Sequence, residues 1–250
     1  MTMWTDGGRD AVICVACSTQ FPPGADVPDE CPICADDRQY IPDVGQLWTT
    51  LAEETGKHHN TFEEVEPGLT RITTSPKFGI GQHAWLVETR GGRILWDLVG
   101  YVDETTIAEI QRRGGIDAIA ISHCHYYSTM VEWSHALGDI PILLHEANRE
   151  WVMRPDDRVR YWEGDTLAPL EGVTLIRTGG HFPGGMVMHV DGSVHAHRAG
   201  LLFVGDIIQV VQDRHMVTFM YSYPNAIPLD PGSVRRIADM VKPYAFDRIY

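Results

Sequence analysis

The stretch AISHCHYYSTMVEW, residues 120–133, decides how this sequence is read. It begins within an apolar run, IDAIAIS at 116–122, whose length and composition predict a short strand buried on both faces. The run leads into His123 and His125. In an extended backbone, alternation would point both histidines to one face and leave Cys124 on the other, as a small buried apolar residue. A histidine pair at a strand end predicts the beginning of a metal site.

Two further candidate ligands follow other predicted strands. His181 lies in RTGGHFPGG, where Gly179 and Gly180 allow the backbone to pass close to a metal, and Asp206 ends the apolar run LLFVGD. Loops that follow strands commonly carry the chemistry of a rigid scaffold. We therefore predict four candidate ligands of a zinc or iron ion, namely His123, His125, His181 and Asp206.

The elements around these motifs alternate between strands and helices. Residues 83–99 form two β-rich runs joined at Gly91 and Gly92, which is a hairpin signal. Residues 103–114 form a helix that Asp103 caps and Gly114 ends. Further strands and helices follow, and a helix over 231–244 precedes a terminal strand in FDRIY. This pattern predicts an α/β layered domain.

The N-terminal residues contain a second cluster of metal-ligand type. CVAC (Cys14, Cys17) and CPIC (Cys31, Cys34) are two Cys-x-x-Cys pairs that can complete a four-sulfur shell around one ion. About 40 residues cannot build a self-sufficient core, so the ion would be structural. The alternatives are two disulfides or unligated thiols. The module is similar to zinc ribbons and to the rubredoxin knuckle, which would hold iron, but its short spacing favours zinc.

The chain thus divides into three predicted parts. Residues 1–43 are the four-cysteine module, 44–67 a linker helix, and 68–250 the large domain. The linker is predicted from Leu47, Trp48 and Leu51, whose spacing fits a helix.

The order of motifs in residues 68–250 resembles the metallo-β-lactamase superfamily. That family carries a His-x-His-x-Asp-His motif, a later single histidine and a Gly-Asp aspartate. The resemblance implies an αββα four-layer sandwich, with His123, His125 and His181 as one metal site and Asp206 as the bridging carboxylate. It extends to the small group whose members carry a cysteine-rich ribbon before this domain.

The sequence also departs from the family pattern. Tyr127 stands in place of the motif's aspartate and Ser128 in place of its third histidine, and no histidine follows FDRIY. The resemblance therefore supports a mononuclear site. Asp206 would coordinate the ion or deprotonate a water molecule. Tyr127, or its neighbour Tyr126, would donate a hydrogen bond to an oxyanion; alternatively, Tyr127 only fills the space of the lost second metal.

Composition limits the partners and the compartment. The net charge of -14 argues against nucleic acid and anionic membranes, both of which attract basic surfaces. No signal segment and no apolar run of membrane-spanning length is present. We expect a cytoplasmic protein with a small-molecule substrate; the sequence leaves open whether it forms a homo-oligomer.

The sequence is compatible with three functions. The first is a metal-dependent hydrolase of an ester, thioester, lactone or amide. The second is a non-catalytic binding or interaction protein with a degenerate site, and the third an iron-dependent oxidoreductase. Four retained ligands favour the first, whereas the lost motif positions favour the second.

Overall fold

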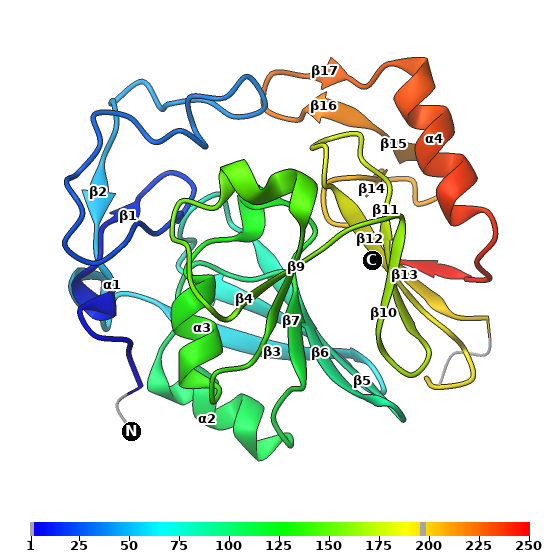
Figure 1. Cartoon of the computed structure of the whole chain (residues 1–250), viewed down its shortest axis with the longest axis horizontal. Helices are drawn as coiled ribbons and strands as arrows, with labels where there is room; N and C mark the ends of the chain where they lie inside the picture. The colour runs from blue at the N-terminus through cyan, green and yellow to red at the C-terminus, as the bar shows by residue number, and fades with distance from the viewer. Residues whose placement is uncertain (1–2, 196–198) are drawn as a thin grey trace.

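Two β-sheets packed face to face form the centre of the molecule, which is described by a computed structural model over residues 3–195 and 199–250 (Figure 1). In the larger sheet β3 to β6 are antiparallel and β6 to β9 are parallel. Its strands are β3 (His59–Glu66), β4 (Leu69–Ser75), β5 (His83–Thr89), β6 (Gly92–Trp96), β7 (Ala118–Ala120), β8 (Ile142–His145) and β9 (Val159–Trp162).

The smaller sheet follows the larger one in the chain. Its spatial order is β10 (Thr166–Leu170), β11 (Val173–Arg177), β12 (Met186–Val190), β13 (Leu201–Phe203) and β18 (Arg248–Ile249). Only the last neighbour pair, β13 with β18, is parallel. Two small hairpins, β14 (Gln209–Val210) with β15 (Val217–Thr218) and β16 (Met220–Ser222) with β17 (Ile227–Pro228), lie between β13 and the last helix.

Strand alternation separates three apolar layers. Trp85, Trp96 and Ala120 face the gap between the sheets and meet residues such as Met188 and Phe203 of the smaller sheet. The neighbouring residues of these strands point outward, because successive side chains alternate across a sheet. The larger sheet is therefore buried on both faces.

Helices cover the two outer faces. The helices α2 (Glu104–Arg112) and α3 (Met130–Ala136) pack on the larger sheet, and α4 (Pro231–Val241) packs on the smaller one. Asp103 caps α2 by accepting the Thr106 N–H, as the sequence predicted, and Asp230 caps α4. The predicted αββα sandwich is confirmed.

The four-cysteine module packs directly on the larger sheet's outer layer. Its chain includes the turn η1 (Gly8–Asp10) and β1 (Ile13–Cys14), and β1 pairs with β2 (Trp48–Thr49). Phe21 and Ile33 of the module belong to the same apolar cluster as Trp133 of α3. The module and the sandwich therefore share one core.

The expected linker helix over 44–67 is wrong. Only one helical turn forms, α1 (Leu51–Glu54), and residues 59–66 are β3, the edge strand of the larger sheet. A short isolated helix is marginal, whereas β3 pairs with β4 along nearly its whole length. Within the described residues, no helix is both long and apolar enough to cross a membrane.

Candidate metal centre

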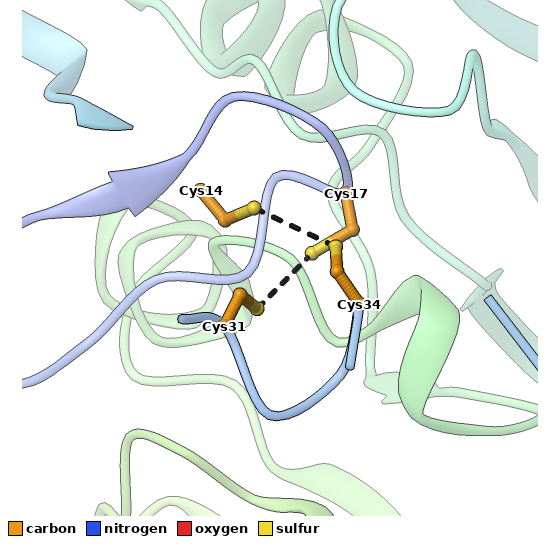
Figure 2. A group of neighbouring side chains, drawn as sticks. All are labelled: Cys14, Cys17, Cys31 and Cys34. Atoms are coloured by element: carbon orange, nitrogen blue, oxygen red, sulfur yellow. Dashed lines mark hydrogen bonds between the residues drawn. The ribbon is translucent and has the colours of Figure 1, made fainter. Parts of the chain in front are cut away.

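The four cysteine side chains converge as the sequence predicted (Figure 2). The Sγ atoms of Cys14 and Cys34 lie 3.7 Å apart, as do those of Cys17 and Cys31, and all four residues are buried without a disulfide. A tetrahedral ion with metal–sulfur bonds of about 2.3 Å needs sulfur atoms about 3.8 Å apart. The cluster therefore fits one tetrahedral ion with a closed shell.

His123, His125, His181 and Asp206 also come together. Each offers one ligand atom, and these four atoms all lie within 4.8 Å of one another. They arrive from three places: His123 and His125 follow β7, His181 lies between β11 and β12, and Asp206 follows β13. All three segments leave their strands at one edge of the sandwich.

The backbone at the histidine pair differs from the sequence expectation. Cys124–Tyr126 is a 3-10 turn, η2, and not extended. The two histidines still meet because the turn brings His125 back toward His123, with ring centroids 4.8 Å apart. Cys124 is fully buried, as expected.

The distances within the histidine cluster fit a metal ion. His181 Nε2 lies 3.3 Å from His125 Nδ1, and Asp206 Oδ2 lies 3.5 Å from His123 Nε2. Two ligands of a tetrahedral ion with bonds of about 2.0–2.1 Å are about 3.4 Å apart. His123 Nε2 is buried and has no hydrogen-bond partner among the described residues. An ion would satisfy that atom, so the residues present fit a metal.

Outer contacts orient the histidine rings. His181 Nδ1 donates to the Met220 carbonyl at 3.1 Å, which leaves its Nε2 lone pair toward the cluster. On the other side, Ser122 Oγ lies 2.9 Å from His123 Nδ1. Buried Asp97 accepts hydrogen bonds from both the Ser122 N–H (2.7 Å) and the Ser122 hydroxyl (3.0 Å).

Gly205 explains how Asp206 approaches this group. Its φ of 50° is left-handed, and a Cβ there would lie 2.4 Å from Ser122 Oγ. Only glycine fits so close to the Asp97–Ser122 pair.

Electrostatics hold the ligands in their binding forms. Burial, reinforced by the neighbouring histidines, lowers the pKa of His181 to about 2, and burial lowers that of His125 to about 4. Burial alone would raise the pKa of Asp206, but contacts with His123 and His125 hold it well below its usual range. His125 and His181 are thus neutral imidazoles and Asp206 is a carboxylate at neutral pH, and these are ligand types that zinc and iron take.

Asp206 opens to a cavity of about 610 Å³. Its side chain is 28% exposed, whereas His123 and His125 are almost fully buried. Tyr126 also lines the cavity, and its hydroxyl lies 3.4 Å from Asp206 Oδ1. The histidine site thus has an approach from outside through Asp206.

Tyr127 lies elsewhere. It is buried in the core, its neighbours include Cys124, Asn148 and Tyr161, and it is not among the described residues that line the cavity. The prediction that Tyr127 acts at the site is corrected by this arrangement, because the η2 turn directs Tyr126 toward Asp206 instead.

Ser128 contacts the four-cysteine module. Its hydroxyl lies 3.0 Å from Ser18 Oγ, and its carbonyl accepts the Gln20 N–H at 3.2 Å. The two positions at which the sequence departs from the metallo-β-lactamase motif thus hold a core tyrosine and a module contact.

Three further residues at the site, Asp97, Gln39 and Gln82, were not predicted from the sequence. Asp97 carried a signal, since it ends an apolar strand adjacent to the one before His123. Gln39 and Gln82 carried none, because glutamine is a common surface residue and neither belongs to a ligand motif. Both line the cavity.

Comparisons with known proteins agree with this architecture. No protein-family model matches the chain. The uncharacterized protein YmaE of Bacillus subtilis (strain 168) is 48% identical over 240 residues, which cover 95% of this chain and 86% of YmaE.

Among solved structures, the DIM-1 metallo-β-lactamase matches with a TM-score of 0.58 and 16% identity, over 76% of this chain and 88% of that one. VMB-1 matches with a TM-score of 0.57 and 12% identity, over 74% and 84%. The chain therefore has the metallo-β-lactamase fold, and identities this low show the fold alone.

Proposed function

The chain belongs to the family of Bacillus subtilis YmaE, and we propose that it is a metal-dependent hydrolase with one ion at the histidine cluster. Its substrate is a small molecule with an ester, thioester, lactone or amide carbonyl. The observation that carries the proposal is the convergence of four ligand atoms within 4.8 Å, beside a cavity that reaches Asp206.

His123, His125 and His181 would hold the ion, which lowers the pKa of a coordinated water from about 15.7 to about 7 and polarises a carbonyl. Asp206 is ionised and exposed to the cavity, so it is placed to take the proton of the attacking water. The water oxygen adds to the carbonyl carbon, the carbon–heteroatom bond breaks, and the leaving group departs with that proton.

Tyr126 supplies a neutral donor in this scheme. Burial and the nearby Asp206 raise its pKa well above the usual range, so the phenol keeps its proton. A protonated hydroxyl near the reacting atoms can hydrogen-bond a developing oxyanion. We assign this donor role, which the sequence left open between Tyr127 and Tyr126, to Tyr126.

The cavity suits a small and largely uncharged substrate. Its volume lies within the range of small-molecule sites. Lys77 and Asp206 are the charged residues among those that line it in the described chain. The acidic chain and unpaired cysteine thiols fit a cytoplasmic enzyme without a nucleic-acid partner.

Elemental analysis tests the proposal. We expect about two ions per chain in the wild type and about one in the double variant His123→Ala/His181→Ala. The matched control is His59→Ala/His215→Ala, which removes two exposed histidines and should keep both ions. The zinc- and iron-loaded proteins are then assayed with p-nitrophenyl acetate and with thioester and lactone substrates.

The competing proposal is a non-catalytic binding protein, which the replacement of two motif ligands by Tyr127 and Ser128 favours. If the wild type carries one ion and the double variant retains it, the histidine cluster is empty. That result would favour the non-catalytic binding protein. Colour separates zinc from iron at the cysteines, since a ferric four-thiolate centre absorbs visible light.

A further inference from the structure

A short segment of the four-cysteine module, residues 36–40, crosses to the histidine side of the molecule. Three consecutive carbonyls, those of Asp37, Arg38 and Gln39, accept hydrogen bonds from the β16–β17 hairpin. Asn225 Nδ2 donates to Asp37 O at 2.9 Å and to Gln39 O at 3.1 Å, and Ser222 Oγ donates to Arg38 O at 3.2 Å. Figure 1 shows the N-terminal loops reaching these two strands. The β16–β17 hairpin thereby holds the backbone of the segment through these three carbonyls.

Arg38 adds a second anchor. Its guanidinium carbon lies 4.1 Å from the centroid of the Phe182 ring and 4.9 Å from that of Tyr221, and the group pairs with Asp36. Phe182 in turn packs against all three ligand histidines, with ring centroids 5.0–5.6 Å apart. Through Arg38, the segment therefore contacts Phe182, the residue that packs against the three candidate ligand histidines.

Gln39 follows Arg38 and points its amide at the cluster. Its Nε2 lies 3.5 Å from His125 Nδ1, the atom that also lies 3.3 Å from His181 Nε2 and 3.9 Å from Asp206 Oδ2. Gln39 also lines the cavity. It thus stands between the ligand atoms and the space from which a substrate would approach.

Neither residue at the two altered motif positions faces the cluster. Tyr127 is turned into the core, and the Ser128 hydroxyl lies against Ser18. An amide has no proton to lose near neutral pH, so Gln39 is suited to donate a hydrogen bond and unsuited to acid–base work.

We propose that Gln39 contacts the substrate, and that its amide N–H donates a hydrogen bond to the carbonyl oxygen on which charge develops. The four-cysteine module would then be part of the active site and would help select substrates with an accessible carbonyl. This inference rests on the proposed hydrolase function.

The test compares zinc-loaded wild type with Gln39→Ala and with Gln39→Met, which keeps the length and packing of the side chain. Gln111→Ala is the matched control, because Gln111 is an exposed glutamine on α2. Zinc content is measured by elemental analysis, and binding of the probe acetohydroxamate by calorimetry. Hydrolysis of p-nitrophenyl acetate gives kcat and KM.

We expect both Gln39 variants to keep two ions per chain, as the wild type does. They should bind acetohydroxamate at least about 10-fold more weakly and lose at least about 10-fold in kcat, because a donor aimed at a developing oxyanion acts mainly in the transition state. Gln111→Ala should match the wild type in every measurement.

Three outcomes overturn the proposal in distinguishable ways. If the wild type binds the probe and cleaves the ester, and Gln39→Met does both equally well, only the Gln39 assignment is wrong. If zinc-loaded wild type does neither, the hydrolase function fails and the Gln39 role fails with it. A loss of zinc in both variants would make Gln39 a structural residue, which also overturns the proposal.

Discussion

The two candidate metal sites of this chain are built in opposite ways. The cysteine site uses two local pairs within residues 14–34, its four ligands are buried, and its paired sulfur atoms lie 3.7 Å apart. The histidine site draws ligands from residues 123–206 and opens through Asp206 to a cavity. A closed shell can stabilise a fold but leaves no position for a substrate, whereas an ion held by the three histidines alone would keep its fourth position open.

The sites are nevertheless joined. Gln82 is buried, and its amide donates to Cys17 O at 3.0 Å, to Ser18 Oγ at 3.2 Å and to His125 O at 3.0 Å. A single side chain therefore ties the cysteine loop to the turn that carries a histidine ligand. The cysteine module therefore has a closed ligand shell and yet contacts the surroundings of the histidine site.

The largest effect should come from breaking the closed shell. Cys14→Ser/Cys34→Ser should lose the cysteine ion and with it up to about 10 kcal/mol of folding free energy. Because the module shares the core of the larger sheet, we expect the whole chain to be destabilised. Urea unfolding followed by tryptophan fluorescence measures this. Retention of wild-type stability would show that the module folds without its ion.

The second-largest effect should come from the outer contacts of the histidine site, whose loss should lower its metal affinity. Asp97→Ala removes the group that holds Ser122 beside His123, and loss of such support typically lowers metal affinity about 10- to 100-fold. Competition with a chelator, read by elemental analysis, gives the affinity at each site. Asp239→Ala, on the exposed face of α4, is the control. An equal loss of ions from both sites would contradict the assignment of Asp97 to the histidine site.

A smaller effect should follow from cutting the link between the sites. Gln82→Leu leaves buried acceptors without their donor, which costs about 1–3 kcal/mol in the free energy of unfolding. Ion affinity should fall at the histidine site and stay unchanged at the closed cysteine shell. If neither stability nor affinity changes, the two sites are independent.

The smallest effect concerns a histidine outside both sites. His145 Nδ1 accepts the Ala147 N–H at 3.1 Å, and its Nε2 donates to Gly164 O at 3.0 Å, so it is held neutral without a metal. Burial lowers its pKa below 6.5. The unfolded chain therefore takes up a proton below pH 6.5 before the folded chain does, and this residue's contribution to stability falls as the pH is lowered.

His145→Gln should remove that contribution. The free energy of unfolding of the variant should depend less steeply on pH between pH 7 and pH 5 than that of the wild type, as measured by urea titration at each pH. Equal slopes in the two proteins would show that His145 titrates alike when folded and unfolded.

Much of the site was predictable because its motifs are local or follow strands. The pairs Cys14/Cys17 and Cys31/Cys34 bring their thiols together through short turns, and the ligands His123, His125, His181 and Asp206 each follow a recognisable apolar strand. The same strands predicted an α/β layered domain, and the resemblance of the motifs to the metallo-β-lactamase superfamily predicted its αββα arrangement. The boundaries proposed at residues 43 and 67 remain predictions, although β1 pairs with β2 across the first of them.

What the sequence by itself determined is therefore the ligand set and the layers, since both follow from short-range patterns of cysteine, histidine and apolar residues. Only the tertiary structure decided that residues 59–66 form an edge strand, because β4 offers them a pairing partner. It also decided that Tyr126 rather than Tyr127 meets Asp206, because the η2 turn directs the Tyr126 ring toward Asp206 and the Tyr127 ring into the core. Gln39, Gln82 and Asp97 gain their positions from segments distant in sequence, and such contacts exist only once the core has packed.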